Sequence, residues 1–484
     1  MEQMESLCTR RNYFLIIIAA IAGLGGFLFG FDSSVIADTK DQIVSQFFLS
    51  DFQWSLIVSI SLLGSVIGIP VSGFFADRLS RKTLLGVAAL GFMIGTILCA
   101  EARELNHLLY GRFLIGVCIG MASYISPLFI AEIAPQHIRG GMILINGLAI
   151  TFGQAFSYLI GYFLHDVSAS SWRILMGMGI LPAFGLLIGM MFVPHSPRFI
   201  MKKYGFDRAR SVLKKIHQNE TVIISELNEI KFNINQSQSN SSWITLLSPP
   251  LLFVLLIGIG LGIFQQFSGI NAFMYYGPVI FENAGFHPIK NAILATFWIS
   301  FINFTFTVVT LLLVDKLGRR FLLLSGMLIS TISLFLIGIY YQQQWMDYKW
   351  LMLLFMSTYM MGYCVSVGSL FWVLISEIYP LRVRGLAMSI ATVVQWAANF
   401  LVSISFLEIF HAYGETKTFW LFGLICLSAC LFIYYYIPET TNVSLEKIED
   451  NLMAGKKMRE LGQLPQLALV KSTKILAVEA NNKS

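Results

Sequence analysis

The chain has 484 residues, of which 56% are hydrophobic and only 12% are charged, and its mean hydropathy is +0.70. Soluble domains carry about 25% charged residues, so these values exclude an ordinary soluble protein and indicate an integral membrane protein. The formal net charge of +6 is spread over several short segments, which gives little support to a nucleic-acid partner.

Apolar runs of about 17 to 25 residues, long enough to cross a bilayer, recur along almost the whole chain. They predict an all-α membrane protein with twelve spans, and no room remains for a separate soluble catalytic domain. The first span is too long and too rich in glycine for a removed signal peptide, so it is expected to stay. The predicted spans lie near 13–37, 55–76, 83–103, 107–132, 142–163, 174–193, 249–277, 291–314, 321–342, 350–376, 384–408 and 418–437.

The first span contains a carboxyl group, Asp32, in the stretch GGFLFGFDSSVI at 25–36. An ionisable residue inside a membrane span is costly and is a functional hypothesis by default. The best candidate partner is Arg112, which stands at the start of the fourth span in LLYGRFLIGVCIG. Two alternatives stay open: Asp32 forms a purely structural pair with Arg112, or it is an acid near the helix end, since Asp38 follows six residues later.

The distribution of Lys and Arg between the loops predicts the orientation of the chain. Even-numbered loops carry basic clusters, as at 78–82, 316–320 and 382–384, whereas odd-numbered loops carry about one basic residue each. Both termini are therefore expected in the cytoplasm. The long connection at 194–248 begins with amphipathic helical spacing and ends in a polar stretch, which predicts a short cytoplasmic helical linker.

The linker separates two groups of six spans that share motifs at matching positions. GFFADRLSRK at 73–82 corresponds to LLLVDKLGRR at 311–320, and EIAPQHIRG at 132–140 corresponds to EIYPLRVRG at 377–385. Two repeated halves in the same orientation are typical of transporters that bind substrate between them. A transporter is thus favoured over a membrane enzyme, and a channel would need a continuous pore of which the sequence gives no sign. The predicted parts are two six-helix pseudo-symmetric bundles at 13–193 and 249–437, the linker at 194–248, and a cytoplasmic tail at 438–484.

The charged residues of these motifs stand at the ends of spans. There they can pair across helices in one state and separate when the two halves move, so they are predicted to form a conformational latch. The alternative is that each basic residue only anchors its loop on the cytoplasmic side. The candidate latch residues are Asp77, Arg78, Arg81, Glu132, Arg139, Asp315, Arg319, Arg320, Glu377 and Arg384.

These motifs resemble those of the sugar porter family of the major facilitator superfamily, from about residue 25 to residue 442. Besides the doubled loop elements, the resemblance rests on PHSPR at 194–198, PETTN at 438–442 and GIFQQFSGINAFMYYGP at 262–278. It implies the major facilitator fold and is strongest towards bacterial proton-coupled pentose and hexose symporters of the xylose, arabinose or galactose type.

Three residues depart from the family pattern, all near the ends of spans. Ser80 stands where the first loop motif usually has Gly, His195 replaces the Glu of P-E-S-P-R, and Thr441 replaces a Lys. These departures concern cytoplasmic charge pairs, especially any formed by Arg198, and leave the motif of the seventh span unchanged.

A sugar offers hydroxyl groups and apolar C–H faces, so a site for it needs amides and aromatic surfaces. Amides inside a membrane are costly unless they are satisfied; taken singly, each could also be an interhelical hydrogen bond. Gly262, Gly269 and Gly277 make the seventh span easy to break, as a discontinuous transporter helix requires, and Gly368 would let the tenth flex. The resemblance implies that Gln154, Gln265, Gln266, Asn271, Trp372 and Gln395 contact the sugar, with Trp396 and Asn399 beside them. Tyr275 and Tyr276 follow the amides of the seventh span and are expected to form an outer lid.

The resemblance also implies a role in proton coupling for Asp32 and Arg112, because proton-coupled members carry an Asp and an Arg in the matching elements of the first and fourth spans. Burial favours a neutral carboxyl group and a nearby guanidinium favours a charged one, so an Asp that changes its distance from an Arg can bind and release a proton. The predicted function is import of a monosaccharide with a proton by alternating access. A facilitative sugar uniporter and a proton-coupled polyol transporter, for example for inositol, stay open.

The remaining residues point to no other chemistry. The six cysteines lie in spans or in the N-terminal tail and the histidines are scattered, so no enzymatic activity, metal or cofactor is expected. The expected partners are a monosaccharide, a proton and the lipid bilayer, with no nucleic acid, and the chain is expected to act as a monomer. The short outer loops favour a multi-pass protein of the plasma membrane, as in a bacterial inner membrane.

Overall fold

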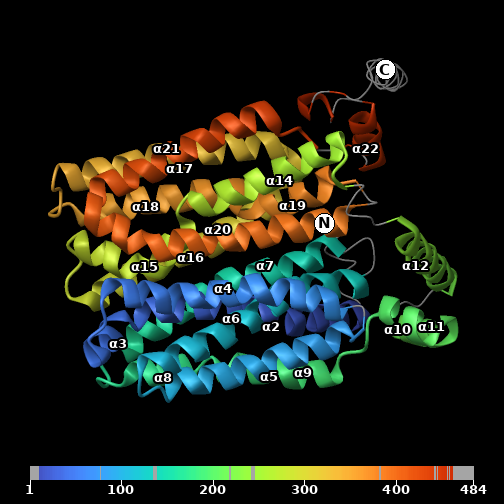
Figure 1. The fold of residues 1–484 in the computed structure, drawn as a ribbon, viewed down its shortest axis with the longest axis horizontal. Helices are drawn as coiled ribbons and strands as arrows, with labels where there is room; N and C mark the ends of the chain where they lie inside the picture. Colours follow the sequence, from blue (N-terminus) through green and yellow to red (C-terminus); the bar gives the residue numbers. More distant parts are fainter. Residues whose placement is uncertain are drawn as a thin grey trace, which may run out of the picture.

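The computed structural model is an assembly of long helices that run side by side in two bundles (Figure 1). The first bundle contains α2 to α9 and the second contains α14 to α21, each roughly parallel to the long axis of the molecule. The structure describes residues 10–76, 78–134, 139–216, 220–240, 246–380, 383–440, 443, 445–454, 456 and 458–461.

Within these residues, twelve helical segments are long and apolar enough to cross a membrane. Each coincides with one of the predicted spans, so the prediction of an all-α membrane protein with twelve spans is confirmed. Several helices begin before the predicted spans do. Two of them begin at Asp51 and Glu415, and an acidic residue stabilises the N-terminus of a helix. The chain is therefore a multi-pass membrane protein.

The first bundle is built from six spans, the sixth of which is interrupted around Met178. Its helices are α2 (Arg10–Asp38), α3 (Lys40–Phe47), α4 (Asp51–Ala76), α5 (Arg81–Ala100), α6 (Leu105–Ile133), α7 (Arg139–Leu164), α8 (Ser171–Gly177) and α9 (Ile180–Phe192).

The second bundle is built from the other six spans, two of which are broken. Its helices are α14 (Pro249–Phe267), α15 (Ile270–Asn283), α16 (Ile289–Leu317), α17 (Arg319–Gln342), α18 (Lys349–Tyr363), the π-helical turn η2 (Cys364–Gly368), α19 (Ser369–Ile378), α20 (Arg384–Tyr413) and α21 (Glu415–Tyr436).

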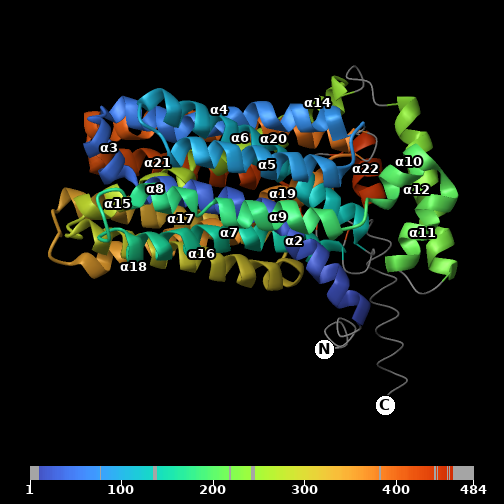
Figure 2. The ribbon, with the colours of Figure 1, turned by 90° about the horizontal axis from the view of Figure 1, so that it is seen from below.

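Short helices gather at one end of the two bundles, which we call the linker end. They are α10 (Pro197–Tyr204), α11 (Phe206–Ile216), α12 (Glu220–Asn240), α22 (Leu445–Met453) and the 3-10 turn η3 (Met458–Glu460). Figures 1 and 2 show α10 to α12 and α22 at this end, and α3 and α8 at the opposite end. We call the opposite end the loop end.

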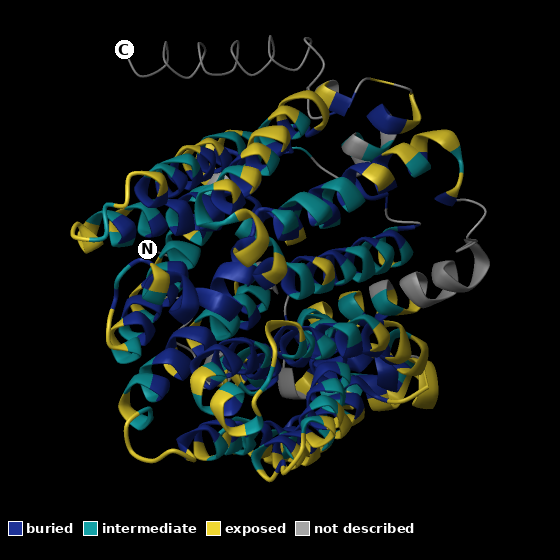
Figure 3. Cartoon of the chain, turned by 60° about the vertical axis from the view of Figure 1, so that its left-hand side comes forward, coloured by how far each residue is buried: buried dark blue, intermediate teal, exposed yellow. Residues whose placement is uncertain are grey.

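Buried residues line the helix faces that point into each bundle, and exposed ones lie mainly on the outside (Figure 3). One of the close helix contacts joins α2 to α7 in the first bundle. A Cβ atom added at Gly26 would lie 2.6 Å from the carbonyl oxygen of Asn146, and one added at Gly30 would overlap the carbonyl oxygen of Ile150. Small residues thus let the two backbones touch, as is common between membrane helices.

The seventh span breaks between α14 and α15. Gly269, between them, has φ of +94°, a left-handed conformation that glycine adopts without steric cost. Of the three glycines predicted to weaken this span, Gly269 is the one at which it breaks. The tenth span breaks at η2, where Ser366 has φ of −103° and ψ of −120° and where Gly368 is the last residue.

Candidate functional site

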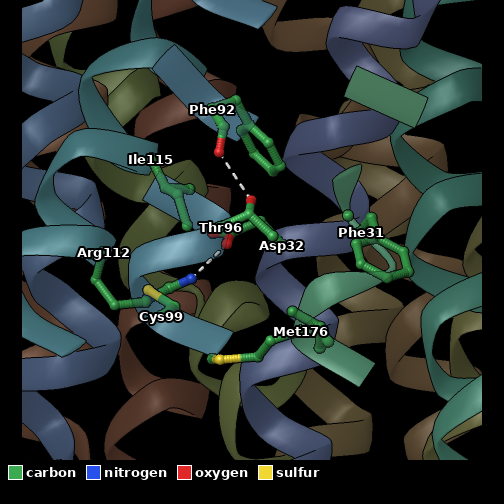
Figure 4. A pocket seen from close by; sticks show the side chains of 10 residues that line it. Phe31, Asp32, Phe92, Thr96, Cys99, Arg112, Ile115 and Met176 are labelled. Carbon is green, nitrogen blue, oxygen red and sulfur yellow. Dashed lines mark hydrogen bonds and ion pairs between the residues drawn. The ribbon is translucent and has the colours of Figure 1, made fainter. Parts of the chain in front are cut away.

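Asp32 and Arg112 form a buried ion pair inside the first bundle (Figure 4). Their side chains are 6% and 1% exposed. The guanidinium has donors to spare, and its Nε and NH2 atoms donate to the carbonyl oxygen of Ile57 at 3.3 Å and to the Ser61 hydroxyl at 2.9 Å. Arg112 is thus anchored to α4 independently of Asp32, so the carboxyl group can leave without freeing the guanidinium.

The pocket around this pair is mostly apolar. Phe31, Phe92, Ile115 and Met176 surround the carboxyl group (Figure 4). The nearby Thr96 hydroxyl donates to its own helix, to the carbonyl oxygen of Phe92 at 2.8 Å. The residues that line this pocket all come from the first bundle, and Tyr275 of the second bundle lies close enough to Asp32 and Arg112 to interact with them.

Predicted amides from two spans meet at the broken tenth span. The Gln265 amide nitrogen donates to the carbonyl oxygens of Val367 and Gly368 at 3.0 Å and 3.3 Å. Gln395 donates to the Gln265 amide oxygen at 3.0 Å. A π-helical turn interrupts the regular helical bonding, so its carbonyl groups are available to a side chain. The structure therefore brings α14, η2 and α20 together through these amides.

Gln266 and Asn271 meet across the break in the seventh span. The Asn271 amide nitrogen donates to the Gln266 amide oxygen at 2.6 Å. Both residues were predicted as sugar contacts, and the left-handed Gly269 between them turns the chain so that their side chains can bond.

A third amide pair crosses from one bundle to the other. Asn303 of α16 donates to the Gln154 amide oxygen at 3.1 Å, and the Gln154 nitrogen lies 3.4 Å from the Ser33 hydroxyl. The Cys364 thiol at η2 donates to the Asn303 amide oxygen at 3.0 Å. Asn303 was absent from the predicted site. The signal available in the sequence was a lone amide within the eighth span.

The other predicted site residues lie at different depths. Trp396 is buried, and its ring lies 5.0 Å from that of Phe29 of the first bundle. Asn399 is buried and accepts from the Ser403 hydroxyl at 3.3 Å. Tyr275 is buried, and its hydroxyl interacts with the Asn399 side chain. Trp372 is 42% exposed and lies outside this buried set.

Polar contacts join the two bundles at the loop end. Asp51 lies 2.9 Å from the His411 imidazole, and Lys290 lies 2.8 Å from Asp166. Hydrogen bonds from His165 and Lys290 lower the pKa of the exposed Asp166. The structure is therefore closed at the loop end.

Four of the predicted latch residues form matching ion pairs at the linker end. Arg81 bonds to Glu132 at 3.0 Å in the first bundle, and Arg319 bonds to Glu377 at 3.2 Å in the second. Both pairs lie within a bundle.

The remaining latch residues divide into two groups. The guanidinium of Arg78 lies 4.4 Å from the ring centroid of Phe74, Arg320 donates to the Tyr434 carbonyl oxygen at 2.6 Å, and Arg384 donates to the Tyr379 carbonyl oxygen at 3.1 Å. Asp77 and the side chains of Arg139 and Asp315 lie outside what the structure describes.

The repeated motifs make matching contacts in the two bundles at the linker end. Ser196 of PHSPR bonds to Glu132, and Thr440 of PETTN bonds in the same way to Glu377. The carboxylate before Thr440, Glu439, accepts from the first two backbone N–H groups of α17 at 3.0 Å each. In the first bundle the matching position is His195, whose pKa is lowered by burial and by the nearby Lys82 and Lys203.

Two departures from the family pattern, Ser80 and His195, therefore compensate each other at the N-terminus of α5. Since His195 offers no carboxylate to α5, the Ser80 hydroxyl caps that helix by accepting from the Thr83 N–H at 3.1 Å. In the second copy Gly318 has φ of +86°, and a Cβ there would lie 2.8 Å from the Glu439 carboxylate. A glycine is needed where the acid caps the helix, and a serine is suitable where it does not.

The family model described as "Sugar (and other) transporter" matches residues 18–452. The galactose-proton symporter of Escherichia coli (strain K12) is 35% identical over 460 residues, which cover 93% of this chain and 96% of the symporter. The arabinose-proton symporter of Bacillus subtilis (strain 168) is 34% identical over 443 residues, which cover 90% and 94%. The inward-open structure of the xylose transporter XylE from E. coli has a TM-score of 0.78 and 31% identity, covering 90% of this chain and 99% of XylE.

The chain therefore belongs to the sugar transporter family and has the major facilitator fold. The resemblance predicted from its motifs is confirmed. Its relatives include proton symporters for galactose and arabinose, and the family is one of transporters.

Proposed function

We propose that this chain imports a monosaccharide, a pentose or a hexose, together with a proton by alternating access. The observation that carries the proposal is the set of buried and half-buried amides from four spans, bonded to one another or to a backbone carbonyl group beside two broken helices. Hydrogen-bond donors and acceptors in equal supply suit the hydroxyl groups of a sugar, and the absence of charge from this set suits a neutral ligand.

The sugar contacts are the predicted Gln154, Gln265, Gln266, Asn271 and Gln395, with Asn303 added from its bond to Gln154. Several of these amides bond to one another, and a bound sugar would exchange some of these bonds for bonds to its hydroxyl groups. The Gln395 amide oxygen is buried without a partner among the described residues and is a free acceptor for the ligand, and Tyr275 belongs to the site as its lid. Trp372, Trp396 and Asn399 complete the proposed site.

Asp32 and Arg112 couple the proton. Protonation of Asp32 removes the charge that holds it to Arg112, and the guanidinium stays bonded to α4. The empty carrier, with Asp32 charged and paired with Arg112, resists reorientation, whereas the carrier with Asp32 protonated and the sugar bound reorients. The sugar and the proton therefore cross together.

Alternating access uses contacts at the two ends of the bundles. The loop end faces the outside and is closed here by the Asp51–His411 and Asp166–Lys290 contacts. The linker end carries the basic clusters and faces the cytoplasm, where Arg81–Glu132 and Arg319–Glu377 belong to the latch. The chain acts as a monomer in the plasma membrane, a bacterial inner membrane, and catalyses no reaction.

Uptake of a panel of labelled pentoses, hexoses and inositol into proteoliposomes tests this function. One or more monosaccharides should enter, with alkalinisation of the outer medium, and Gln265→Ala and Asn271→Ala should weaken binding. Uptake without alkalinisation would favour the uniporter, and a preference for inositol would favour the polyol transporter. If both amide variants keep native affinity for every compound that enters, the proposed site is wrong.

A further inference from the structure

Asp38, the last residue of α2, is a second carboxyl group in the first span, and the mechanism above does not use it. It is 6% exposed, and both of its oxygens are buried without a hydrogen-bond partner. No described Lys, Arg or His lies within ion-pair distance of it, in contrast to Asp32, which has Arg112. Burying an unpaired carboxylate is so costly that such a group takes up a proton instead.

Asp38 occupies a slot in the contact between α2 and α7. It follows Gly30 and Ser34 at four-residue spacing, which keeps it near the side of α2 that faces α7. Opposite it on α7 is Gly161, where an added Cβ would overlap a carboxylate oxygen of Asp38 and lie 2.6 Å from its carboxyl carbon. A larger residue at 161 would therefore displace the acid.

The slot lies beside a contact that closes the loop end. Tyr158, one turn before Gly161 on α7, is fully buried and close enough to Asp38 for their charges to interact. Its hydroxyl donates to the carbonyl oxygen of Met274 on α15, in the other bundle. A movement of α15 that opens the loop end would break this bond and bring water towards the slot.

Other titratable groups approach this region from the neighbouring helices. On α7, His165 follows Gly161 by one turn; its Nε2 is buried without a partner and its Nδ1 lies 3.0 Å from the exposed Asp166. The remaining groups interact elsewhere: Lys40 of α3 with Asp41, Asp51 and Glu282, Tyr275 of α15 with Asn399, Arg112 of α6 with Asp32, and Arg173 of α8 with the Ala100 carbonyl group.

We propose that Asp38 is a second proton-binding site whose neutral form is required to close the loop end. This proposal rests on the proposed function, from which it takes the direction of transport. Because Asp38 is the last residue of α2 and lies near the loop end (Figure 1), its proton enters from and returns to the solution on that side. Asp38 therefore gates the carrier without adding to the number of protons carried.

The test measures closure of the loop end against pH and needs no sugar. Spin labels on cysteines at the exposed positions Glu104 and Ala412, one in each bundle, report the distance across the loop end. The measurement is made in an Asp32→Asn, His411→Gln background, from about pH 6 to about pH 9, so that neither the first carboxyl group nor the imidazole of the closing contact with Asp51 contributes. We expect the closed population, relative to the open one, to fall about tenfold per pH unit above the midpoint of a single titration.

Asp38→Asn should abolish this dependence and hold the loop end closed throughout the range. Asp38→Ser continues the row of small residues, packs without strain and should behave in the same way. Asp41→Asn, the same change at an exposed position three residues away, should keep the native profile.

A closed population that does not change with pH, a profile unchanged by both Asp38 variants, or an open loop end in both variants overturns the proposal. These results are separate from failure of the proposed function, which would appear as no uptake of any sugar by the native chain. In transport, Asp38→Asn should keep the native accumulation ratio and extend sugar exchange to higher pH.

Discussion

The hydrogen bond from Tyr158 to the Met274 carbonyl group makes a prediction about the closed loop end. In α15 the residue four positions after Met274 is Pro278, and proline has no N–H to donate. The carbonyl group of Met274 therefore lacks its usual helical donor, and the Tyr158 hydroxyl of the other bundle takes that place. The substitution Tyr158→Phe removes this donor and keeps the ring.

Tyr158→Phe destabilises only the conformation in which the loop end is closed. With the loop end closed, the variant leaves a buried carbonyl group without a partner, which costs about 1–3 kcal/mol. With the loop end open, water satisfies the same carbonyl group. The ratio of closed to open carriers should therefore fall by about 5- to 150-fold.

The distance between spin labels at Glu104 and Ala412 measures this ratio directly. Tyr162→Phe, one turn further along α7, is the matched control, because the Tyr162 hydroxyl has no hydrogen bond within the described part of the chain while its ring lies 5.0 Å from the Lys290 ammonium. An unchanged distance distribution in Tyr158→Phe, or an equal shift in Tyr162→Phe, would refute the reasoning.

Three further changes probe packing, capping and the sugar site. Gly30→Ala places a methyl group on a carbonyl oxygen of α7 and should destabilise the first bundle by about 1–3 kcal/mol, seen as a lower unfolding temperature in detergent; Gly86→Ala, where the nearest atom is 3.8 Å away, is the control and should leave that temperature unchanged. Gly318→Ala combines a left-handed backbone with a contact on Glu439 and should lower the same temperature by a strain of about 1–2 kcal/mol. Asn303→Ala should raise the KM for the transported sugar about 5- to 100-fold, and an unchanged KM would remove it from the site.

Hydropathy alone predicts the spans because a bilayer admits few structures other than long apolar helices. The pairing of Asp32 with Arg112 was also predictable, since two ionisable groups within apolar runs have few other partners. The bond between Gln265 and Gln395 joins two residues that the resemblance implied as contacts of one ligand.

Other contacts depend on which residues meet in space, and no local pattern carries that information. Asn303 is an ordinary lone amide until α16 places it against Gln154. Ser80 caps α5 in place of the carboxylate that His195 replaces, and this relation appears only when two segments far apart in the chain meet at one helix end. Likewise, three glycines made the seventh span weak, but packing against Phe273 and Phe422 accompanies the break at Gly269.

The central claim is that Asp32 couples sugar movement to a proton. Its most direct test is the steady sugar accumulation ratio in proteoliposomes held at an inside-negative potential of about 100 mV, which supplies about 2.3 kcal/mol per proton. The native chain should concentrate its sugar up to about fifty-fold, whereas Asp32→Asn should equilibrate it to a ratio of about one while still exchanging it. If Asp32→Asn accumulates the sugar as the native chain does, the coupling mechanism is contradicted.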